Sequence, residues 1–165
     1  MDRKGILVVV SGFSGSGKGT LMKALVEKYH QYALSISATT RQPRPGEENG
    51  REYFFVTREA FLKMAEENAL IEYAQYVENY YGTPREYVEK QLASGRDVIL
   101  EIEIQGALKV KEKMPETLLL FVTPPSAQEL KRRLINRGTE SLEVIESRLA
   151  RAAEEAEGMP KYDYI

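Results

Sequence analysis

Residues 5–20 read GILVVVSGFSGSGKGT, and this stretch decides the fold of the N-terminal part of the chain. Its first seven residues form an apolar run rich in β-branched side chains, which predicts a strand buried on both faces. A glycine-rich turn, GFSGSGK at residues 12–18, follows directly. Apolar side chains then recur at helical spacing up to about Tyr29. The stretch therefore predicts a strand, a tight loop and a helix in immediate succession.

The composition of this loop suits phosphate groups. Successive backbone N–H groups can surround phosphates only where no Cβ blocks the approach, and the following helix N-terminus adds its positive end. Lys18 is placed to reach the β- and γ-phosphates of ATP. Such loops usually end in Ser or Thr, whose hydroxyl binds Mg²⁺, but here Gly19 stands at that position and Thr20 follows. This variant weakens the prediction of a hydroxyl ligand and leaves phosphate binding untouched.

We therefore expect an ATP site on the loop. Its predicted members are Gly12, Phe13, Ser14, Gly15, Ser16, Gly17, Lys18, Gly19 and Thr20. The alternative, a glycine-rich turn without a ligand, is disfavoured because four glycines surround a lysine between a predicted strand and a predicted helix.

Composition narrows the class of protein. The 165 residues, 42% hydrophobic and 29% charged, suit one globular domain, and no apolar run approaches the ~20 residues of a membrane span. Cysteine is absent and His30 is the single histidine, to which we assign no role, so thiol and multi-histidine chemistry are disfavoured. A net charge of −2 argues against a nucleic-acid surface, while clustered arginines suit small anions. The default compartment is the cytoplasm.

The rest of the chain predicts an α/β fold with a mostly parallel sheet flanked by helices. Strands are expected at residues 97–104 (DVILEIEI) and 117–122 (TLLLFV), and the final KYDYI resembles the start of another strand. Helices are expected from Thr57 to Asn68, from Thr83 to near Gly95 and from Ser126 to Asn136, each with a hydroxyl cap at the start, and from Ser141 to about Gly158. At Thr83, capping and a contact to a ligand are compatible.

Residues 35–82 break this rhythm. Residues 41–50 (RQPRPGEENG) predict a loop, residues 52–56 a short strand, and tyrosines are frequent throughout the segment. We interpret it as an insertion with a small sheet of its own.

The motifs of the whole chain resemble guanylate kinase. They include SATTRQPRPGE at 37–47, GREYFF at 50–55, IEYA at 71–74, YYGT at 80–83, LEIEIQG at 100–106, PPS at 124–126 and RLINRGT at 133–139. The resemblance implies a P-loop fold formed by residues 1–34, 93–125 and 150–165, an inserted GMP-binding region at 35–92 and a helical lid at 126–149. It also implies that family members continue past the position of Ile165 through a strand and a final helix.

The resemblance further implies an acceptor site for GMP. Arg41, Arg44, Tyr53 and Tyr81 would hold its phosphate, Ser37, Glu72 and Thr83 would contact the guanine, and Glu47 and Glu101 complete the set. The chemistry agrees, because guanidinium and phenol groups donate to phosphate while a carboxylate accepts from the N1 and N2 donors of guanine. Adenine would place an acceptor against that carboxylate, a mismatch that rejects analogues by roughly 10⁴-fold or more.

The resemblance assigns the remaining roles to a lid and a metal. Arg133, Arg137 and Arg148 would close over the phosphates, although spacing alone favours a solvated basic face, to which Lys131, Arg132 and Arg151 are assigned. The expected catalytic residues are Lys18, Arg41, Arg137 and Arg148. Glu101 and Glu103, two apart in a predicted strand, would face Mg²⁺ together with Thr20, mainly through water. The family usually has Asp at position 103, which puts a direct metal role in doubt.

The predicted reaction is ATP-dependent phosphorylation of GMP to GDP, with ATP, GMP and Mg²⁺ as partners and no nucleic acid or membrane. A monomer and a homodimer remain open. Two alternatives also remain: a phosphopeptide-binding scaffold of guanylate kinase type, and a related kinase that acts on a ribose phosphate. Scaffolds typically have a degraded P-loop, whereas Lys18 is present here.

Overall fold

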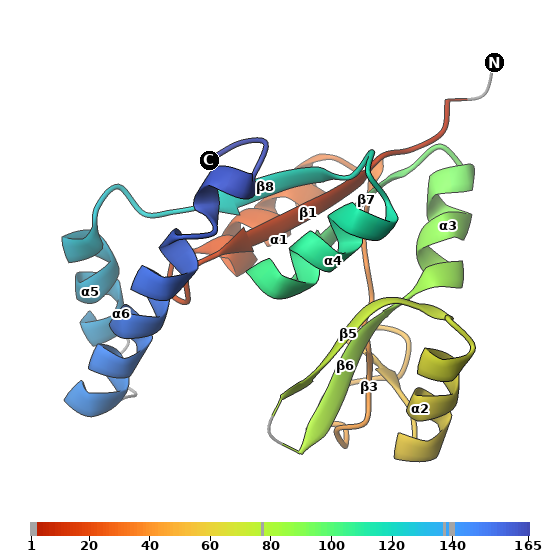
Figure 1. Ribbon diagram of the computed structural model, residues 1–165, viewed down its shortest axis with the longest axis horizontal. Helices are drawn as coiled ribbons and strands as arrows, with labels where there is room; N and C mark the ends of the chain where they lie inside the picture. Colours follow the sequence, from red (N-terminus) through yellow and green to blue (C-terminus); the bar gives the residue numbers. More distant parts are fainter. Residues whose placement is uncertain (1–2, 77, 137, 139–140) are drawn as a thin grey trace.

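The computed structural model describes residues 3–76, 78–136, 138 and 141–165. Within that part of the chain, two four-stranded sheets carry the fold (Figure 1). The first has the order β2-β7-β1-β8 and is parallel throughout, with β1 at Leu7–Gly12, β2 at Tyr32–Leu34, β7 at Asp97–Glu101 and β8 at Leu118–Val122. The predicted α/β class with a mostly parallel sheet is therefore confirmed.

The core explains why these strands are apolar on both faces. Val9, Val98 and Leu119 are fully buried. Helix α4 (Ile104–Lys113) packs Ala107 and Val110 into the larger cluster on one face, while α1 (Lys18–Lys28) contributes Met22 to a smaller cluster on the other. A continuous run of Val and Leu is what a strand between two helical layers requires.

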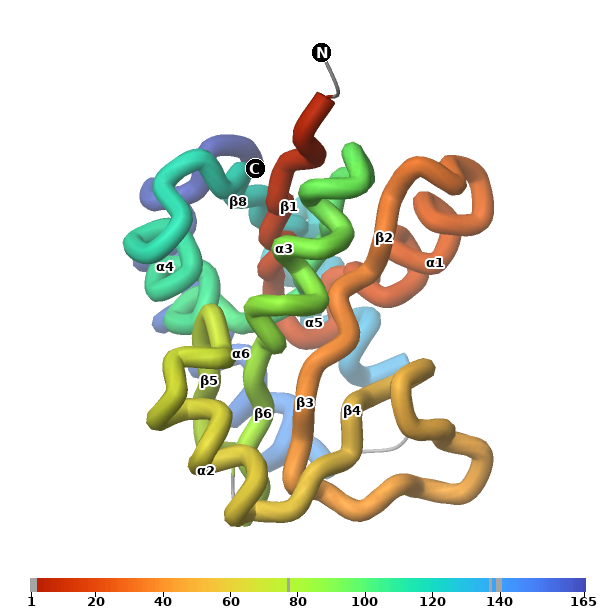
Figure 2. The backbone as a smooth tube through the Cα atoms, turned by 90° about the vertical axis from the view of Figure 1, so that its right-hand side faces the viewer, coloured from red at the N-terminus to blue at the C-terminus, as the bar shows by residue number. Residues whose placement is uncertain are grey.

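The second sheet has the order β4-β3-β6-β5 and is mixed. Its strands are β3 (Ala38–Thr39), β4 (Phe54–Phe55), β5 (Leu70–Tyr76) and β6 (Asn79–Pro84), and helix α2 (Arg58–Glu66) packs on it through the buried Phe61. Helix α3 (Arg85–Ala93) follows β6, as Figure 2 shows, and leads back to β7. The expected small sheet within residues 35–82 is confirmed, with a strand of two residues where 52–56 was predicted.

The remaining elements lie at the carboxyl end of β8. They are α5 (Ala127–Asn136), α6 (Leu142–Ala156) and the short 3₁₀ turn η1 (Met159–Lys161). After η1, Tyr164 forms a single parallel bridge with Leu120, and this bridge stands where the beginning of a strand was expected.

The predicted caps at Thr57 and Ser126 are confirmed, and Ser141, where a helix was expected to start, also caps its helix. The hydroxyl of Thr57 accepts from the Ala60 N–H at 3.1 Å, that of Ser126 from the Glu129 N–H at 3.1 Å, and that of Ser141 from the Val144 N–H at 3.4 Å. The predicted cap at Thr83 is wrong: Pro84 is the N-cap of α3 and makes no side-chain cap, while the Thr83 hydroxyl donates to Glu72.

The predicted strand at residues 97–104 is also wrong in its second half. Strand β7 ends at Glu101, where it pairs with Val10 of β1, and α4, which sequence reasoning missed, begins at Ile104. Beyond this point the Ser11 hydroxyl donates to the Ile102 carbonyl at 2.7 Å in place of a continued ladder. Glu103 is therefore the N-cap residue of a helix and not a strand residue.

The junction of β1 with β8 gives a prediction about stability. A Cβ on Gly12 would lie 2.2 Å from the Val122 carbonyl oxygen, so Gly12→Ala must push the two strands apart. We expect a loss of about 3 kcal/mol in the free energy of unfolding, measured by chemical denaturation. Gly19→Ala is the matched control, because nothing lies within 4 Å of its Cβ position. Equal stability of the two variants would contradict the close approach.

Candidate active site

The glycine-rich loop between β1 and α1 closes on itself and holds its lysine. Gly15 and Gly17 have φ values of 88° and 95°, a left-handed conformation that favours glycine. The Lys18 ammonium donates to the carbonyl oxygens of Gly12 at 2.7 Å and Phe13 at 3.1 Å. These carbonyls hold the cation at the start of the helix, where phosphate oxygens can compete for it.

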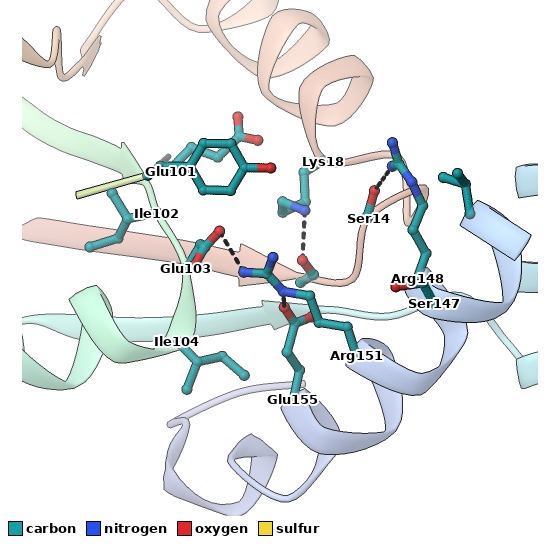
Figure 3. Close-up of a pocket in the computed structure, with 13 residues that line it drawn as sticks. Ser14, Lys18, Glu101, Ile102, Glu103, Ile104, Ser147, Arg148, Arg151 and Glu155 are labelled. Carbon is teal, nitrogen blue, oxygen red and sulfur yellow. Dashed lines mark hydrogen bonds and ion pairs between the residues drawn. The ribbon is translucent and has the colours of Figure 1, made fainter. Parts of the chain in front are cut away.

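A cavity of about 600 Å³ opens beside the loop (Figure 3). Its walls come from the loop, from the segment that follows β7, and from α6. The charged side chains that line it are three cations and three carboxylates: Lys18, Arg148, Arg151, Glu101, Glu103 and Glu155. Because parallel strands end at one edge, the carboxyl end of β7 lies beside the loop, at the place where open α/β sheets bind ligands.

Two arginines of the predicted lid contact the loop. Arg133 of α5 donates to the Ser16 carbonyl oxygen at 3.0 Å, and Arg148 of α6 donates to the Ser14 hydroxyl. Arg133 also pairs with Glu129 at 2.7 Å, and the hydrogen bonds from Arg132 and Arg133 lower the pKa of Glu129 to about 2. Arg137 lies outside the described residues.

Arg151 is the cavity residue that sequence reasoning assigned to the solvated face. Its guanidinium pairs with Glu103 at 2.9 Å and with Glu155 at 3.2 Å, so it links α6 to the N-cap of α4. Its spacing of three residues from Arg148 on one helix face was the signal that could have found it. Glu103 thus shares the cavity with Glu101, although the strand argument for their pairing was wrong.

A second cavity of about 430 Å³ adjoins the first. It is lined by Ser37 and Tyr53, by residues of β5 and β6, and by the first turn of α4. Four residues line both cavities: Tyr76, Glu101, Ile102 and Glu103. Two ligands can therefore lie end to end with Glu101 and Glu103 at the junction.

Glu72 is the buried acid of this second cavity. It is 7% exposed, and the fully buried Thr83 donates its hydroxyl to Oε1 at 2.8 Å. Burial raises the pKa of Glu72, while the hydrogen bond from Thr83 and the positive charges of Lys109 and Lys113 act in the opposite direction. A fixed carboxylate at the wall of a cavity is suited to accept hydrogen bonds from a planar ligand with two adjacent N–H donors.

Arg41 lies in a compact aromatic and acidic cluster. Its guanidinium forms a fork with Glu47, with both N–O distances at 3.0 Å, and its Cζ lies 5.2 Å from the Tyr53 ring centre. The rings of Tyr53 and Tyr81 lie 6.1 Å apart. The hydrogen bond with Glu47 raises the pKa of Arg41, and the same bond lowers that of Glu47. A phosphate offers this guanidinium the same pair of oxygens as the carboxylate.

The structure brings most of the predicted acceptor residues together. Ser37, Tyr53, Glu72, Tyr81 and Glu101 line the second cavity. Of the other predicted members, all of which are described, Thr83 lies behind Glu72, Arg41 and Glu47 hold each other, and the Arg44 side chain is exposed while its N–H donates to Glu47 at 2.7 Å.

The structure places only two of the three predicted metal ligands at the first cavity. Glu101 and Glu103 line the first cavity, whereas Thr20 is exposed and is not among the described residues that line it. In the described part of the chain, no three His, Cys, Asp or Glu residues gather as a metal site. The described helices also include none that is long and apolar enough to cross a bilayer.

Comparison with known proteins decides the family. The family model described as guanylate kinase matches residues 4–165. This chain belongs to the guanylate kinase family. Guanylate kinases of Caldanaerobacter subterraneus subsp. tengcongensis and Oceanobacillus iheyensis are 55% and 54% identical to it over 165 residues, which are the whole chain and 80% of each relative.

A solved structure supports the fold. The guanylate kinase of Anaplasma phagocytophilum superposes with a TM-score of 0.73 at 35% identity, over 99% of this chain and 76% of that one. The resemblance predicted from the motifs is therefore confirmed, and so is the class of enzyme, a kinase. The roles of individual residues stay predictions.

The buried acid Glu72 gives a prediction about pH. Because the folded protein holds the Glu72 proton more tightly than the unfolded chain, stability falls as pH rises from the ordinary glutamate pKa through the raised one. Glu72→Gln cannot ionise and still accepts from Thr83, so we expect a higher melting temperature than wild type at about pH 8. The difference should shrink towards about pH 4, as measured by calorimetry at both pH values.

Glu101→Gln is the control for this prediction, because it removes an exposed carboxylate from the same cavity. A Glu72→Gln variant that melts below wild type at the higher pH would contradict the prediction.

Proposed function

We propose that this chain catalyses ATP + GMP = ADP + GDP. The observation that carries the proposal is the pair of adjoining cavities. One lies on the phosphate loop and is lined by three cations, the other holds the buried Glu72, and Glu101 and Glu103 line both. The names of the relatives, all guanylate kinases, support the same reaction.

The donor is held by the loop. Its amides and the Lys18 ammonium bind the ATP phosphates, and Arg133 and Arg148 neutralise them from α5 and α6, where both already contact the loop. We retain Arg137 as a predicted member of the same group. This assigns residues 126–149 as a lid, 35–92 as the acceptor region and the remainder as the core.

The acceptor is held by the second cavity. Arg41, Arg44, Tyr53 and Tyr81 bind the GMP phosphate, so Arg41 exchanges Glu47 for that phosphate. Glu72, positioned by Thr83, accepts hydrogen bonds from guanine N1 and N2, and the Ser37 hydroxyl donates one to guanine O6. In this arrangement adenine is rejected because its acceptor N1 faces the carboxylate.

The chemistry needs positioning more than proton transfer. The attacking group is a phosphate oxygen that is already anionic near neutral pH, so no general base is required. The obstacle is the repulsion between two polyanions brought in line, and the cations at the loop offset it while donor and acceptor are fixed. Closure over the phosphates also excludes water, which would otherwise hydrolyse ATP.

Oxygen donors at the junction of the cavities fit Mg²⁺. Glu101 and Glu103 supply carboxylates there, and one Glu103 oxygen is paired with Arg151, which suits an outer ligand acting through water. When bound with ATP, the ion neutralises phosphate charge. Thr20 stays a weaker candidate. The cytoplasmic location, the monomer or homodimer and the absence of nucleic acid and membrane partners also stay predictions.

An acceptor panel tests the proposed function. With ATP and Mg²⁺, we expect turnover of GMP and a kcat/KM for AMP lower by roughly 10⁴-fold, measured by coupled release of ADP. UMP and ribose 5-phosphate should give background rates. Turnover of the ribose phosphate instead would indicate a different kinase, and no turnover of any acceptor would indicate a binding module.

The side chain of Lys18 should contribute strongly to kcat. Lys18→Ala is expected to lower kcat for GMP by about 10²–10³-fold, because a preorganised cation at the transferring phosphate is lost. Lys23→Ala on the same helix is the control, since its ammonium is well exposed and lies 4.0 Å from Glu27. Near-normal turnover by the Lys18 variant would defeat this assignment.

Two neighbouring arginines of α5 should differ in effect. Arg133 reaches the loop carbonyl, whereas Arg132 points to Glu129 and is more exposed. We expect Arg133→Ala to lower kcat/KM for ATP by about tenfold or more, because a charge-assisted contact is worth roughly 1.5–3 kcal/mol. Arg132→Ala should change it by less than about twofold. Equal losses of kcat/KM in the two variants would show that both arginines act only through their charge and would contradict a specific role for Arg133.

A further inference from the structure

The first turn of α4 lies against the carboxylate of Glu72, and glycine makes this approach possible. A Cβ on Gly106 would lie 3.1 Å from Glu72 Oε2, 3.5 Å from its Cδ and 3.1 Å from Ile102 Cδ1. Gly106 is the third residue of α4 and lines the second cavity with Glu72. Contacts this short are rare for real Cβ atoms, so any side chain at position 106 requires a neighbour to move.

The carboxylate has little room to withdraw. Its Oε1 is held by the fully buried Thr83 at 2.8 Å. On the neighbouring strand, a Cβ at Gly82 would lie 3.1 Å from the Glu72 carbonyl oxygen and 3.0 Å from Phe61, so the backbone of β5 is also closely packed. A push on Oε2 by a few tenths of an ångström therefore turns the carboxylate and strains the hydrogen bond between Thr83 and Oε1.

Local stability does not explain a glycine at this position. Its φ is not among the left-handed values, and it lies within a regular helix in which alanine is the better helix former. The N-terminal turn of α4 also presents the positive end of the helix to the carboxylate, and this favours the ionised form more strongly at close approach.

We propose that Gly106 is a positioning residue for base selection, because its missing side chain fixes where the Glu72 carboxylate stands to receive the donors of guanine. The proposal rests on the proposed function and adds to it the residue that sets the orientation of the base reader. Gly106 does not touch the reacting phosphates, so its effect falls on the acceptor side.

Gly106→Ala separates this role from a structural one. We expect KM for GMP to rise about tenfold or more and the preference for GMP over AMP to fall, while KM for ATP stays within about twofold of wild type. Calorimetric titration of GMP into the protein should show the same loss of affinity. The melting temperature should fall only slightly, because the better helix propensity of alanine offsets part of the cost of moving Glu72 and Ile102.

A double-mutant cycle tests whether Gly106 affects GMP binding through Glu72. In a Glu72→Ala background, adding Gly106→Ala should leave KM for GMP unchanged, because the side-chain atoms it would displace are already gone. Glu112→Ala, an exposed change on the same helix, is the control and should leave both KM values unchanged. Additive losses in the cycle would overturn the proposal.

Two further outcomes would also overturn it. Recovery of GMP affinity in a Gly106→Ala/Ile102→Ala double variant would show that the clash with Ile102, and not with Glu72, is responsible. A much lower melting temperature together with weaker binding of both nucleotides would show that the glycine serves packing alone. If wild type turns over GMP and Gly106→Ala does so with the same KM, only this inference fails, whereas an inactive wild type removes the proposed function itself.

Discussion

The parallel pairing of β1 with β7 on one side and β8 on the other is the constraint on which the site depends. Val10 pairs with Glu101 and Gly12 with Val122, so three strands end along one edge. From this edge the chain leaves as the phosphate loop, as the segment that carries Glu103, and as the lead into α5. The arginines of α5 and α6 reach the loop because β8 ends beside it. A shift in this register would separate cations and carboxylates that now share one cavity.

Internal partners hold cations of the site in place. The contacts are Lys18 with two loop carbonyls, Arg41 with Glu47, Arg133 with Glu129 and Arg151 with Glu103. Binding of a nucleotide then exchanges one set of acceptors for another, so the free energy gained is the difference between them. Phosphate is more highly charged than a carbonyl or a carboxylate, and this favours the exchange. The internal partners also keep the cations oriented, which reduces the reorganisation needed when two polyanions meet.

Sequence reasoning succeeded where the signal is local. The apolar run, the glycine turn and the helix after it follow each other directly, and the hydroxyls of Thr57 and Ser141 cap the helices they precede. The motif order also predicted the family, because the resemblance extends along the whole chain, and five of the residues that it assigned to the acceptor line one cavity. These features require no knowledge of which distant segments meet.

The failures all depend on distant contacts. Residues 97–104 resemble a buried strand, but β7 ends where its ladder with β1 ends, and the last paired residues, Val10 and Glu101, are 91 apart in sequence. Thr83 stands before a proline as a cap would, yet its hydroxyl goes to Glu72 on the neighbouring strand. Arg132 and Arg151 were both assigned to the solvated class, and only the ion pair of Arg151 with the distant Glu103 distinguishes them.

Glu72 is the residue at which stability and selectivity conflict. Its burial disfavours the charge that guanine recognition requires, so folding already includes part of the desolvation that binding would otherwise incur. The hydrogen bond from Thr83 and the nearby lysines offset this penalty without removing it. Under the proposed function, a carboxylate held in this way cannot turn away from a mismatched base, and it would select by leaving the wrong ligand with an acceptor facing an acceptor. Under the proposed function, selectivity for the base depends more on how rigidly the Glu72 carboxylate is held before the nucleotide binds than on the number of its contacts.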